Sequence, residues 1–543
     1  MEKNIQEKII HLIKESLKDF ENSPSEEPQL DLTQDAKFGD LSTNIAMRLS
    51  KQLKKSPRDI AVQLVANINS QIEKFSLKDY IKEVKVEGAG FINFYLSENY
   101  LYEELKNIII REKEALRLDL GKGRRVLIEF VSANPTGALS VAHARQAAVG
   151  DALASILEFL GFKVSKEYYL NDEGNQINIL GKSTELRMRE LAGEKVEFPE
   201  NYYQGEYIYD IAKLAKEKRI KTEDLGNFAA DYILSIIKQE LHDFGVEFDC
   251  WYSQKELGKS GKIEQAFDYL KKKGLLYDLD GALWFKSTDF LDDKDRVVVK
   301  SDGSQTYLAP DIAYHDDKYK RGFEWLINIW GPDHHGYINR LKSSVAAFGR
   351  DPNSLSILIV QLATIFRDGK PVQMSTRRGE YITLREVLDE VGRDASRFFF
   401  MARRTSSHLD FDLDIAKAQT AQNPVYYVQY AHARIHSILR NSIVKLDKNT
   451  DLSLLKEKEE LALIKKLLQF SYILNICLST QDPYMLTVYL QELSETFHKF
   501  YDVCRVLTED EQLTKARLAL IEGVRIVIAA GLDLLGVSKP EKM

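Results

Sequence analysis

The residues best suited to chemistry lie in one segment, EFVSANPTGALSVAHARQAAVGDAL, at positions 129–153. It begins in an apolar run that predicts a buried strand, passes through a loop containing Pro135 and Gly137, and predicts a helix from about Val141. His143 then falls in the first turn of that helix. Helix N-termini expose unpaired N–H groups and the positive end of the helix dipole, so they bind phosphate. The segment therefore predicts a phosphate site at the end of a strand.

A second segment, FRDGKPVQMSTRRG at 366–379, concentrates positive charge. From Arg367 to Arg378 it holds four basic residues and one acid, Asp368. Taken alone, such a segment is more often a solvated basic hairpin. Its position after a predicted buried strand at 355–362 favours a functional loop that stabilises growing negative charge on phosphates.

Two carboxylates lie where an unpaired charge would be costly. Glu129 falls inside an apolar strand, and Asp311 follows Tyr307 by four residues in TYLAPDIAYH. In a helix, Tyr307 and Asp311 would face the same side. Carboxylates in a partly dry pocket suit a planar guanidinium. Asp311 could instead cap a helix after Pro310.

The elements that must position these residues divide the chain into three regions: 1–110, 111–408 and 409–543. The first mixes helices with short strands. The second alternates strand and helix, which predicts βαβ units, and carries an insertion at about 180–300 with a strand meander. The third is helix after helix. The predicted fold is multidomain: an α+β N-terminal domain, an α/β Rossmann-like catalytic domain with a parallel sheet and insertions, and an all-α C-terminal bundle.

Composition excludes several classes of protein. The 543 residues are 44% hydrophobic and 29% charged, as in soluble globular chains rather than disordered ones. A net charge of −7 argues against coating nucleic acid by bulk charge, although local basic patches remain open. Cys250, Cys477 and Cys504 form no disulfide framework, which predicts a cytoplasmic protein. We expect no membrane association, because no apolar run reaches the roughly 18 residues of a span.

The segment at 129–153 resembles the HIGH signature of class I aminoacyl-tRNA synthetases, with Ser140-Val141-Ala142-His143 at its four positions. SANPTGALSVAHAR is similar to the arginyl-tRNA synthetase family in particular. Ser140 replaces the first His and can donate a hydrogen bond but cannot be a cation. Ala142 replaces Gly and adds a methyl group where adenine is expected to lie close to the backbone.

The basic segment resembles the KMSKS loop of the same class, in the form Gln373-Met374-Ser375-Thr376-Arg377. Both lysine positions are changed, to Gln373 and Thr376, whereas Lys370, Arg377 and Arg378 remain. The resemblance implies catalytic roles for Ser140, His143, Met374, Ser375, Arg377 and Arg378. It implies ATP-binding roles for Pro135, Gly137, Ser140, Ala142, His143, Lys370 and Gln373.

The family resemblance also implies an arginine pocket. It assigns the guanidinium to Glu129, Tyr307 and Asp311, and the α-amino and carboxylate ends to Ser132 and Asn134. GPDHHGYINRL at 331–341 resembles a pocket-lining segment, from which we select Asp333 and His335 over His334. Adjacent histidines point apart and no cysteine or carboxylate cluster completes a ligand set, so we expect no metal site.

The resemblance extends to both ends of the chain and implies contacts with tRNA. Residues 31–61 resemble the N-terminal domain of the family, through Gly39, Asp40 and Asn44. RDASRFFFMARR at 393–404 resembles the DALR sequence before an anticodon-binding bundle. At 423–440, aromatic residues alternate with cations that can stack on unpaired bases, and we expect two of its three tyrosines in the core. The tRNA-binding candidates there are Tyr426, Tyr430 and Arg434.

The function implied is that of an arginine–tRNA ligase, which forms arginyl-adenylate from L-arginine and ATP and transfers arginine to the terminal adenosine of tRNA(Arg). Mg²⁺ is expected with ATP, without a tightly bound cofactor, and the enzyme is expected to be a monomer. One alternative is a non-catalytic tRNA-binding relative, since the ATP signatures depart from the usual pattern. Another is a class I synthetase for a different amino acid, although a neutral substrate would leave Glu129 and Asp311 unmatched.

Overall fold

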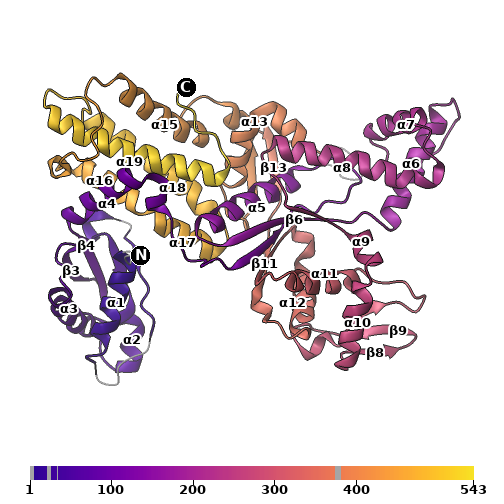
Figure 1. The fold of residues 1–543 in the computed structure, drawn as a ribbon, viewed down its shortest axis with the longest axis horizontal. Helices are drawn as coiled ribbons and strands as arrows, with labels where there is room; N and C mark the ends of the chain where they lie inside the picture. Colours follow the sequence, from indigo (N-terminus) through magenta and orange to yellow (C-terminus); the bar gives the residue numbers. More distant parts are fainter. Residues whose placement is uncertain (1–4, 21–25, 34, 373–380) are drawn as a thin grey trace.

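A five-stranded parallel sheet forms the centre of the protein (Figure 1). The computed structural model describes residues 5–20, 26–33, 35–372 and 381–543. The strand order is β12-β11-β5-β6-β7, and all neighbouring pairs are parallel. The strands are β5 (Arg125–Glu129), β6 (Lys163–Leu170), β7 (Cys250–Ser253), β11 (Trp325–Trp330) and β12 (Leu355–Ile359).

Helices cover both faces of this sheet, as a parallel sheet requires. Val126 and Ile128 of β5 join the main core with α5 (Val141–Phe159), the predicted crossover helix. Leu127 points the other way and packs under α11 (Leu308–Lys320) and α12 (Ile338–Ala347). The predicted βαβ unit is therefore confirmed.

The insertion expected at about 180–300 is not continuous. It returns to the central sheet at β7, which pairs with β6 and splits the insertion into two excursions. All four residues of β7 are half-buried, so its sequence shows neither alternation nor a buried apolar run. The first excursion is helical: α6 (Asn175–Glu190), α7 (Tyr207–Glu217) and α8 (Leu225–Asp243).

The second excursion has a small core of its own. It carries the predicted meander, an antiparallel sheet in the order β10-β9-β8. Its elements are α9 (Gln254–Lys259), α10 (Lys262–Lys272), β8 (Leu276–Leu279), β9 (Ala282–Phe285) and β10 (Arg296–Val299).

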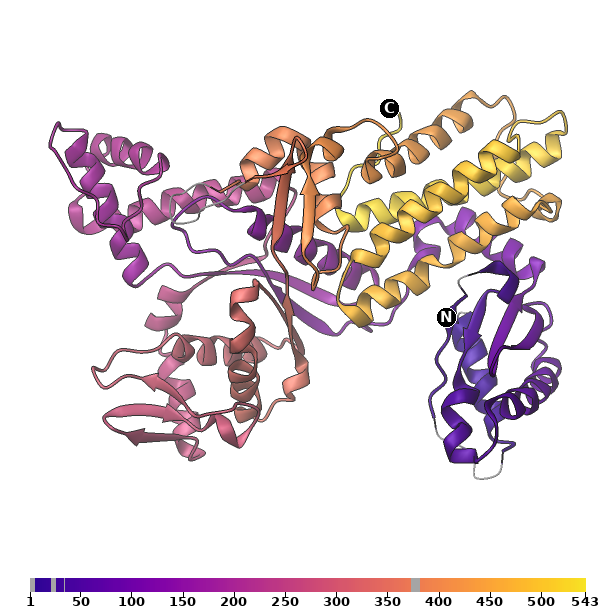
Figure 2. The same ribbon diagram turned by 180° about the vertical axis from the view of Figure 1, so that it is seen from behind.

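The N-terminal region is an α+β unit with a four-stranded antiparallel sheet, in the order β1-β2-β4-β3. It lies beside the C-terminal helices in both views (Figures 1 and 2). Its elements are α1 (Ile5–Leu17), β1 (Asp31–Leu32), β2 (Leu41–Thr43), α2 (Ile45–Leu53), α3 (Pro57–Lys74), β3 (Ile81–Glu87), β4 (Phe91–Leu96) and α4 (Glu98–Arg111).

A small sheet connects the central region to the C-terminal one. In it, β13 pairs with β14 in a hairpin and in parallel with β15, which begins at residue 409. The helix between them, α13, bends at Gly392, where φ is 78°. These elements are β13 (Ala363–Arg367), β14 (Lys370–Pro371), α13 (Leu384–Phe400), β15 (Leu409–Asp412) and α14 (Leu413–Lys417).

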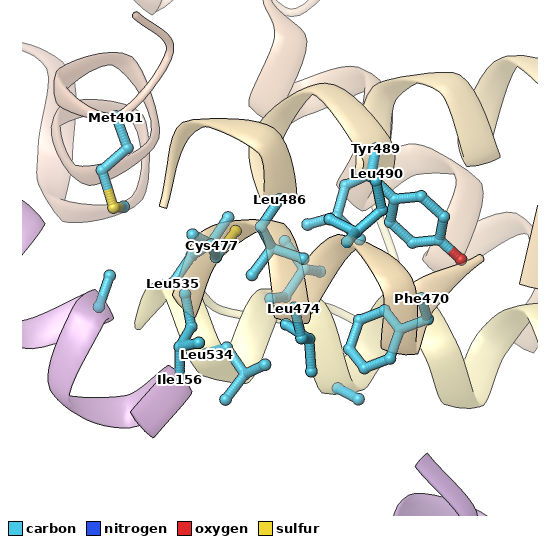
Figure 3. Close-up of a cluster of buried hydrophobic side chains, with 14 of the residues drawn as sticks. Ile156, Met401, Phe470, Leu474, Cys477, Leu486, Tyr489, Leu490, Leu534 and Leu535 are labelled. Atoms are coloured by element: carbon cyan, nitrogen blue, oxygen red, sulfur yellow. The ribbon is translucent and has the colours of Figure 1, made fainter. Parts of the chain in front are cut away.

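The C-terminal region is the predicted helical bundle. Its helices are α15 (Pro424–Asn441), α16 (Lys458–Leu468), α17 (Phe470–Thr480), α18 (Tyr484–Val503) and α19 (Glu511–Leu535). Figure 3 shows that Ile156 of α5 meets the apolar cluster of α17, α18 and α19, so the helix of the first signature is packed onto the bundle.

Within the described chain, the segment Lys458–Thr480 is long and apolar enough to cross a membrane by length and composition. It spans α16 and α17, and Leu463, Leu467, Ile473 and Leu474 are buried in the bundle. Core helices of soluble proteins pass the same test.

Candidate active site

A row of polar side chains crosses the sheet where its strands end. Glu129 of β5 is in register with Asn328 of β11 on one side and Glu167 of β6 on the other. Residues in register in a parallel sheet share a face, and this face is covered by α11. All three side chains are buried, so each needs a partner.

Both acids of this row have a cation from α11 or its C-cap. The Lys318 ammonium lies 2.5 Å from Glu129 Oε2 and donates to Asn328 Oδ1 at 3.2 Å. Arg321 donates to both oxygens of Glu167, at 2.6 and 2.9 Å. Burial alone would raise the pKa of Glu167, but Arg321 and Lys318 hold that pKa below its usual value.

Asp311, in the first turn of α11, has no such cation. In the described part of the chain, no ammonium or guanidinium group lies within 4 Å of its carboxylate. Burial raises the pKa of the Asp311 carboxyl to about 7, and the charge of Glu129 adds to this effect. The nearby Tyr337 hydroxyl and the charge of Lys318 oppose it. Asp311 is thus a half-buried acid whose pKa is raised by Glu129 and that has no counterion among the described residues.

The backbone after β5 is strained. Val131 and Ser132 have φ of 66° and 41°, values that β-branched residues such as Val rarely adopt. The turn directs Ser132 Oγ to Glu129 Oε1 at 3.3 Å, while Ser132 Oγ accepts from the Tyr169 N–H at 3.1 Å. Strain of this kind clusters at ligand sites. The predicted strand at 125–131 accordingly ends at Glu129 instead.

Other residues predicted for the arginine pocket lie further out. Asn134 donates to Gln176 at 2.8 Å. Tyr307 precedes α11 and is 74% exposed, so the structure does not bring it against Asp311. Asp333 and His335 are exposed in the 3₁₀ segment Pro332–Tyr337.

The aromatic residues near the carboxylates were missed by sequence reasoning. Tyr337 faces Asp311, and burial raises the pKa of Tyr337 far above its usual value. Burial, together with the charges of Asp311 and Glu129, raises the pKa of Tyr169. Tyr314 donates a hydrogen bond to Glu167 Oε1 at 2.7 Å. Lys318 was also missed. A signal existed for α11, because Asp311, Tyr314 and Lys318 recur at i, i+3 and i+7 on one helical face.

The first signature segment folds as predicted, with Ser140 at the N-cap of α5. His143 Nδ1 accepts from the Ser140 N–H at 3.2 Å and lies 3.1 Å from Ser140 Oγ. An Nδ1 that accepts leaves the proton of a neutral imidazole on Nε2. Burial lowers the pKa of His143 to about 4. At neutral pH, His143 is therefore an uncharged donor through Nε2–H.

Two tyrosines hold the loop before α5. Tyr207, from the first insertion, donates to the Thr136 carbonyl at 2.6 Å, and Tyr381 donates to the Ala138 carbonyl at 3.1 Å. Both hydroxyls stand over Gly137, where an added Cβ would lie 3.3 Å from one and 3.5 Å from the other. Pro135 is buried next to this turn.

Arg145, also in the first turn of α5, is fully buried. Its guanidinium donates to the carbonyls of Gln361, Arg404 and Ser407 at 2.7, 3.0 and 3.0 Å. Arg145 thus ties α5 to the segments before β13 and after α13 rather than facing a ligand.

The second signature leaves β13 through the hairpin that carries Lys370, which is exposed. Gln373, Met374, Ser375, Thr376, Arg377 and Arg378 lie outside the described residues. The chain is described again from Tyr381, where it meets the first signature. Val141 N–H donates to the Ile382 carbonyl at 3.2 Å, and Leu384 N–H donates to the Leu139 carbonyl at 2.7 Å.

The N-terminal candidates take part in internal contacts. Asp40 forms an ion pair with Lys465 of α16 at 2.8 Å and accepts from the Leu96 N–H. Gly39 has φ of 87°, and a Cβ there would lie 2.7 Å from the Phe94 carbonyl oxygen. Asn44 is half-buried at the N-cap of α2.

The candidates on α15 form an aromatic surface. Tyr426 and Tyr430 stack with centroids 6.2 Å apart, and Arg434 lies 5.6 Å from the Tyr430 ring. Tyr430 is exposed, and Tyr426 and Tyr427 are half-buried. The expectation of two core tyrosines was wrong, because α15 lies at the edge of the bundle.

Known proteins share this architecture. The solved arginyl-tRNA synthetase of Thermus thermophilus superposes with a TM-score of 0.79 at 23% identity, covering 99% of this chain and 100% of that one. The methionyl-tRNA synthetase of Mycobacterium tuberculosis superposes with a TM-score of 0.56 at 10% identity, covering 77% and 92%. The fold is that of the class I aminoacyl-tRNA synthetases.

Sequence comparison resolves the family. The chain matches "Arginyl tRNA synthetase N terminal domain" at 7–96, "tRNA synthetases class I (R), catalytic domain" at 104–441, and "DALR anticodon binding domain" at 428–543. It is 48% identical to the arginine–tRNA ligase of Geobacter sp. strain M21, over 94% of this chain and 93% of that protein. The corresponding ligase of Listeria monocytogenes is 44% identical over 99% and 98%. The chain belongs to the arginyl-tRNA synthetase family and is a class I ligase.

Proposed function

We propose that this arginine–tRNA ligase binds the guanidinium of its substrate between Asp311 and Glu129. The observation that carries the proposal is that Asp311, a half-buried acid whose pKa is raised by burial and by the charge of Glu129, has no counterion among the described residues. A guanidinium would supply the charge and a planar set of donors. Ser132 and Asn134 lie on the turn after β5, suited to the α-amino and carboxylate ends. Tyr307, Asp333 and His335 would have to move to reach arginine.

ATP would lie over the N-terminus of α5, against the turn containing Pro135 and Gly137. There the helix dipole and His143 Nε2–H face the α-phosphate, and Ser140 and Ala142 border the nucleotide. Ser140 would orient His143 through its backbone N–H, which donates to Nδ1, with its hydroxyl 3.1 Å from the same atom. A neutral donor that is already positioned stabilises developing charge without reorganisation.

The reaction then needs no side-chain nucleophile. The arginine carboxylate attacks the α-phosphate, and pyrophosphate leaves toward Lys370, Gln373 and the cations Arg377 and Arg378, with Met374 and Ser375 in the same loop. Mg²⁺ would enter with ATP as part of the substrate. The 2′-hydroxyl of the terminal adenosine of tRNA(Arg) then attacks the arginyl-adenylate and releases AMP.

For tRNA, we propose that Tyr426, Tyr430 and Arg434 stack on unpaired bases, with the domains divided at about 110 and 408. Gly39, Asp40 and Asn44 would shape the N-terminal domain rather than touch RNA directly. The free cysteines Cys250, Cys477 and Cys504 suit a reducing cytoplasm, and we propose a monomer without membrane association.

The test is pyrophosphate exchange with tRNA present, across arginine, citrulline, lysine and glutamine. We expect the wild-type enzyme to catalyse exchange with arginine and the Glu129→Gln variant to lose this activity. Binding of tRNA without exchange for any amino acid would support the non-catalytic alternative. Exchange with a neutral amino acid at the expense of arginine would refute the pocket.

A further inference from the structure

The charges around the pocket do not balance. Among the described residues, the buried acids Glu129 and Glu167 and the half-buried Asp311 lie together at α11, and two cations reach them: Lys318 of α11 and Arg321 at its C-cap. Arg321 is committed to Glu167 through two hydrogen bonds. Counted over the residues that the structure describes, the cluster is therefore one positive charge short, and the shortage falls at Asp311.

The ammonium group of Lys318 already has partners in all of its hydrogen-bonding directions. It is 0% exposed, it bonds Glu129 and Asn328, and its ammonium lies 4.1 Å from the centroid of the Tyr314 ring. Asn328 in turn contacts His315 Nε2 at 2.9 Å. With every direction occupied, Lys318 cannot also bind a ligand, and its charge serves the pocket only through Glu129.

We propose that Lys318 is a positioning residue for substrate selection. By binding Glu129 Oε2, Lys318 orients Glu129 and neutralises one of the two acids that face arginine. The pocket then lacks one positive charge, which a single monocation supplies. The inference rests on the proposed binding of arginine at Asp311 and Glu129. Without Lys318 the pocket would hold two unmatched acids close together. The charge of Glu129 already raises the pKa of Asp311, so without Lys318 the two carboxyls would share a proton.

The other groups that face Lys318 do not supply its charge. Burial lowers the pKa of His315 well below its usual value, so His315 is neutral. Arg321 also contacts Asp317, which pairs with Lys262 at 2.7 Å. Tyr169, Tyr314 and Tyr337 are neutral phenols whose pKa values burial raises. Removing Lys318 therefore leaves Glu129 without a substitute cation among the described residues.

This predicts a change in protons released when arginine binds. At pH 8, wild type should release about 0.1 proton per arginine, since Asp311, with a pKa of about 7, is mostly ionised. Lys318→Met should release close to one, because arginine must expel the shared proton, and its affinity should fall about tenfold or more. Lys318→Arg keeps the charge and should resemble wild type.

The measurement is calorimetric titration of the full chain with arginine, in buffers of different ionisation enthalpy at one pH. Protons from the α-amino group of arginine are common to all variants and cancel in the comparison. Lys318→Met with the wild-type proton count would overturn the proposal, even if affinity fell. Loss of affinity alone would indicate only disturbed packing.

A double variant keeps the test decisive if Lys318→Met fails to fold. Lys318→Met combined with Glu129→Gln removes one cation and one acid, so the pocket is again one positive charge short. We expect the double variant to bind arginine more weakly, because Glu129 is part of the site, but to release about as few protons per bound arginine as wild type once the site is saturated. A folded double variant that still released one proton would refute the charge balance. Wild-type binding by Asp311→Asn would refute the arginine pocket instead, whatever the Lys318 variants show.

Discussion

Asp311→Asn tests the pocket most directly, because it removes one charge with almost no change in shape. Charge-assisted hydrogen bonds contribute about 1.5–3 kcal/mol, which corresponds to a loss of roughly 10- to 150-fold in kcat/KM for arginine. Discrimination against citrulline should shrink as well. The ureido oxygen of citrulline faces a carboxylate in wild type, whereas the introduced amide can donate to it.

The pH dependence gives a second signature of Asp311. In the free enzyme its pKa is about 7, and a bound guanidinium favours the ionised form. Arginine capture by wild type should therefore be constant above pH 7 and fall about tenfold per pH unit below it. The Asn variant should lack this dependence.

The same shift predicts an effect on stability. A carboxyl whose pKa is raised in the folded state destabilises that state as pH rises from the unfolded value of about 4 to 7, and fully above 7. Asp311→Asn should therefore raise the Tm of the arginine-free enzyme at pH 8. The Asn variant should thus bind arginine more weakly and yet fold more stably than wild type, as expected when a charge is kept for function.

The assay is pyrophosphate exchange with tRNA present, from pH 6 to 8.5, with arginine and citrulline. Asp316→Asn is the matched control, because Asp316 is on the same helix and pairs with Lys320 at 2.6 Å away from the pocket. An unaltered arginine-to-citrulline ratio, together with a wild-type pH profile, would place Asp311 outside the specificity pocket.

Three further predictions concern the signatures and the turn after β5. His143→Ala should slow adenylate formation by about 10²-fold, the scale of one lost positioned donor, with unchanged tRNA affinity in a filter-binding assay; a wild-type rate would remove His143 from the site. Arg377→Ala and Arg378→Ala should raise the KM for ATP more than that for arginine, and unchanged kinetics in both would assign the charge to Lys370 or another cation. Gly150→Ala would place Cβ 2.4 Å from the Phe130 ring, so it should lower Tm and raise the KM for arginine through overpacking of about 1–3 kcal/mol; a wild-type KM would show that the turn tolerates this shift.

Much of the fold follows from local pattern. The βαβ unit, the meander, the helical bundle and the helix at Val141 were predictable, because short apolar runs, 3.6-residue periodicity and capping residues act over a few positions. Glu129 and Asp311 could also be selected, since an acid in an apolar strand and an acid on a buried helical face each need a partner.

Which partner each acid takes was decided only by the tertiary structure. Lys318 lies 189 residues from Glu129 in the chain, and nothing local links them until β5 and α11 pack together. Packing likewise brought β7 into the central sheet and left Tyr307 exposed. It placed Asp40 in an ion pair with the C-terminal bundle and Arg145 in hydrogen bonds within the central domain. The sequence determines which groups must be paired, because burial energy depends on residue type. The pairing itself depends on distances of a few ångströms between distant segments, which only the assembled fold defines.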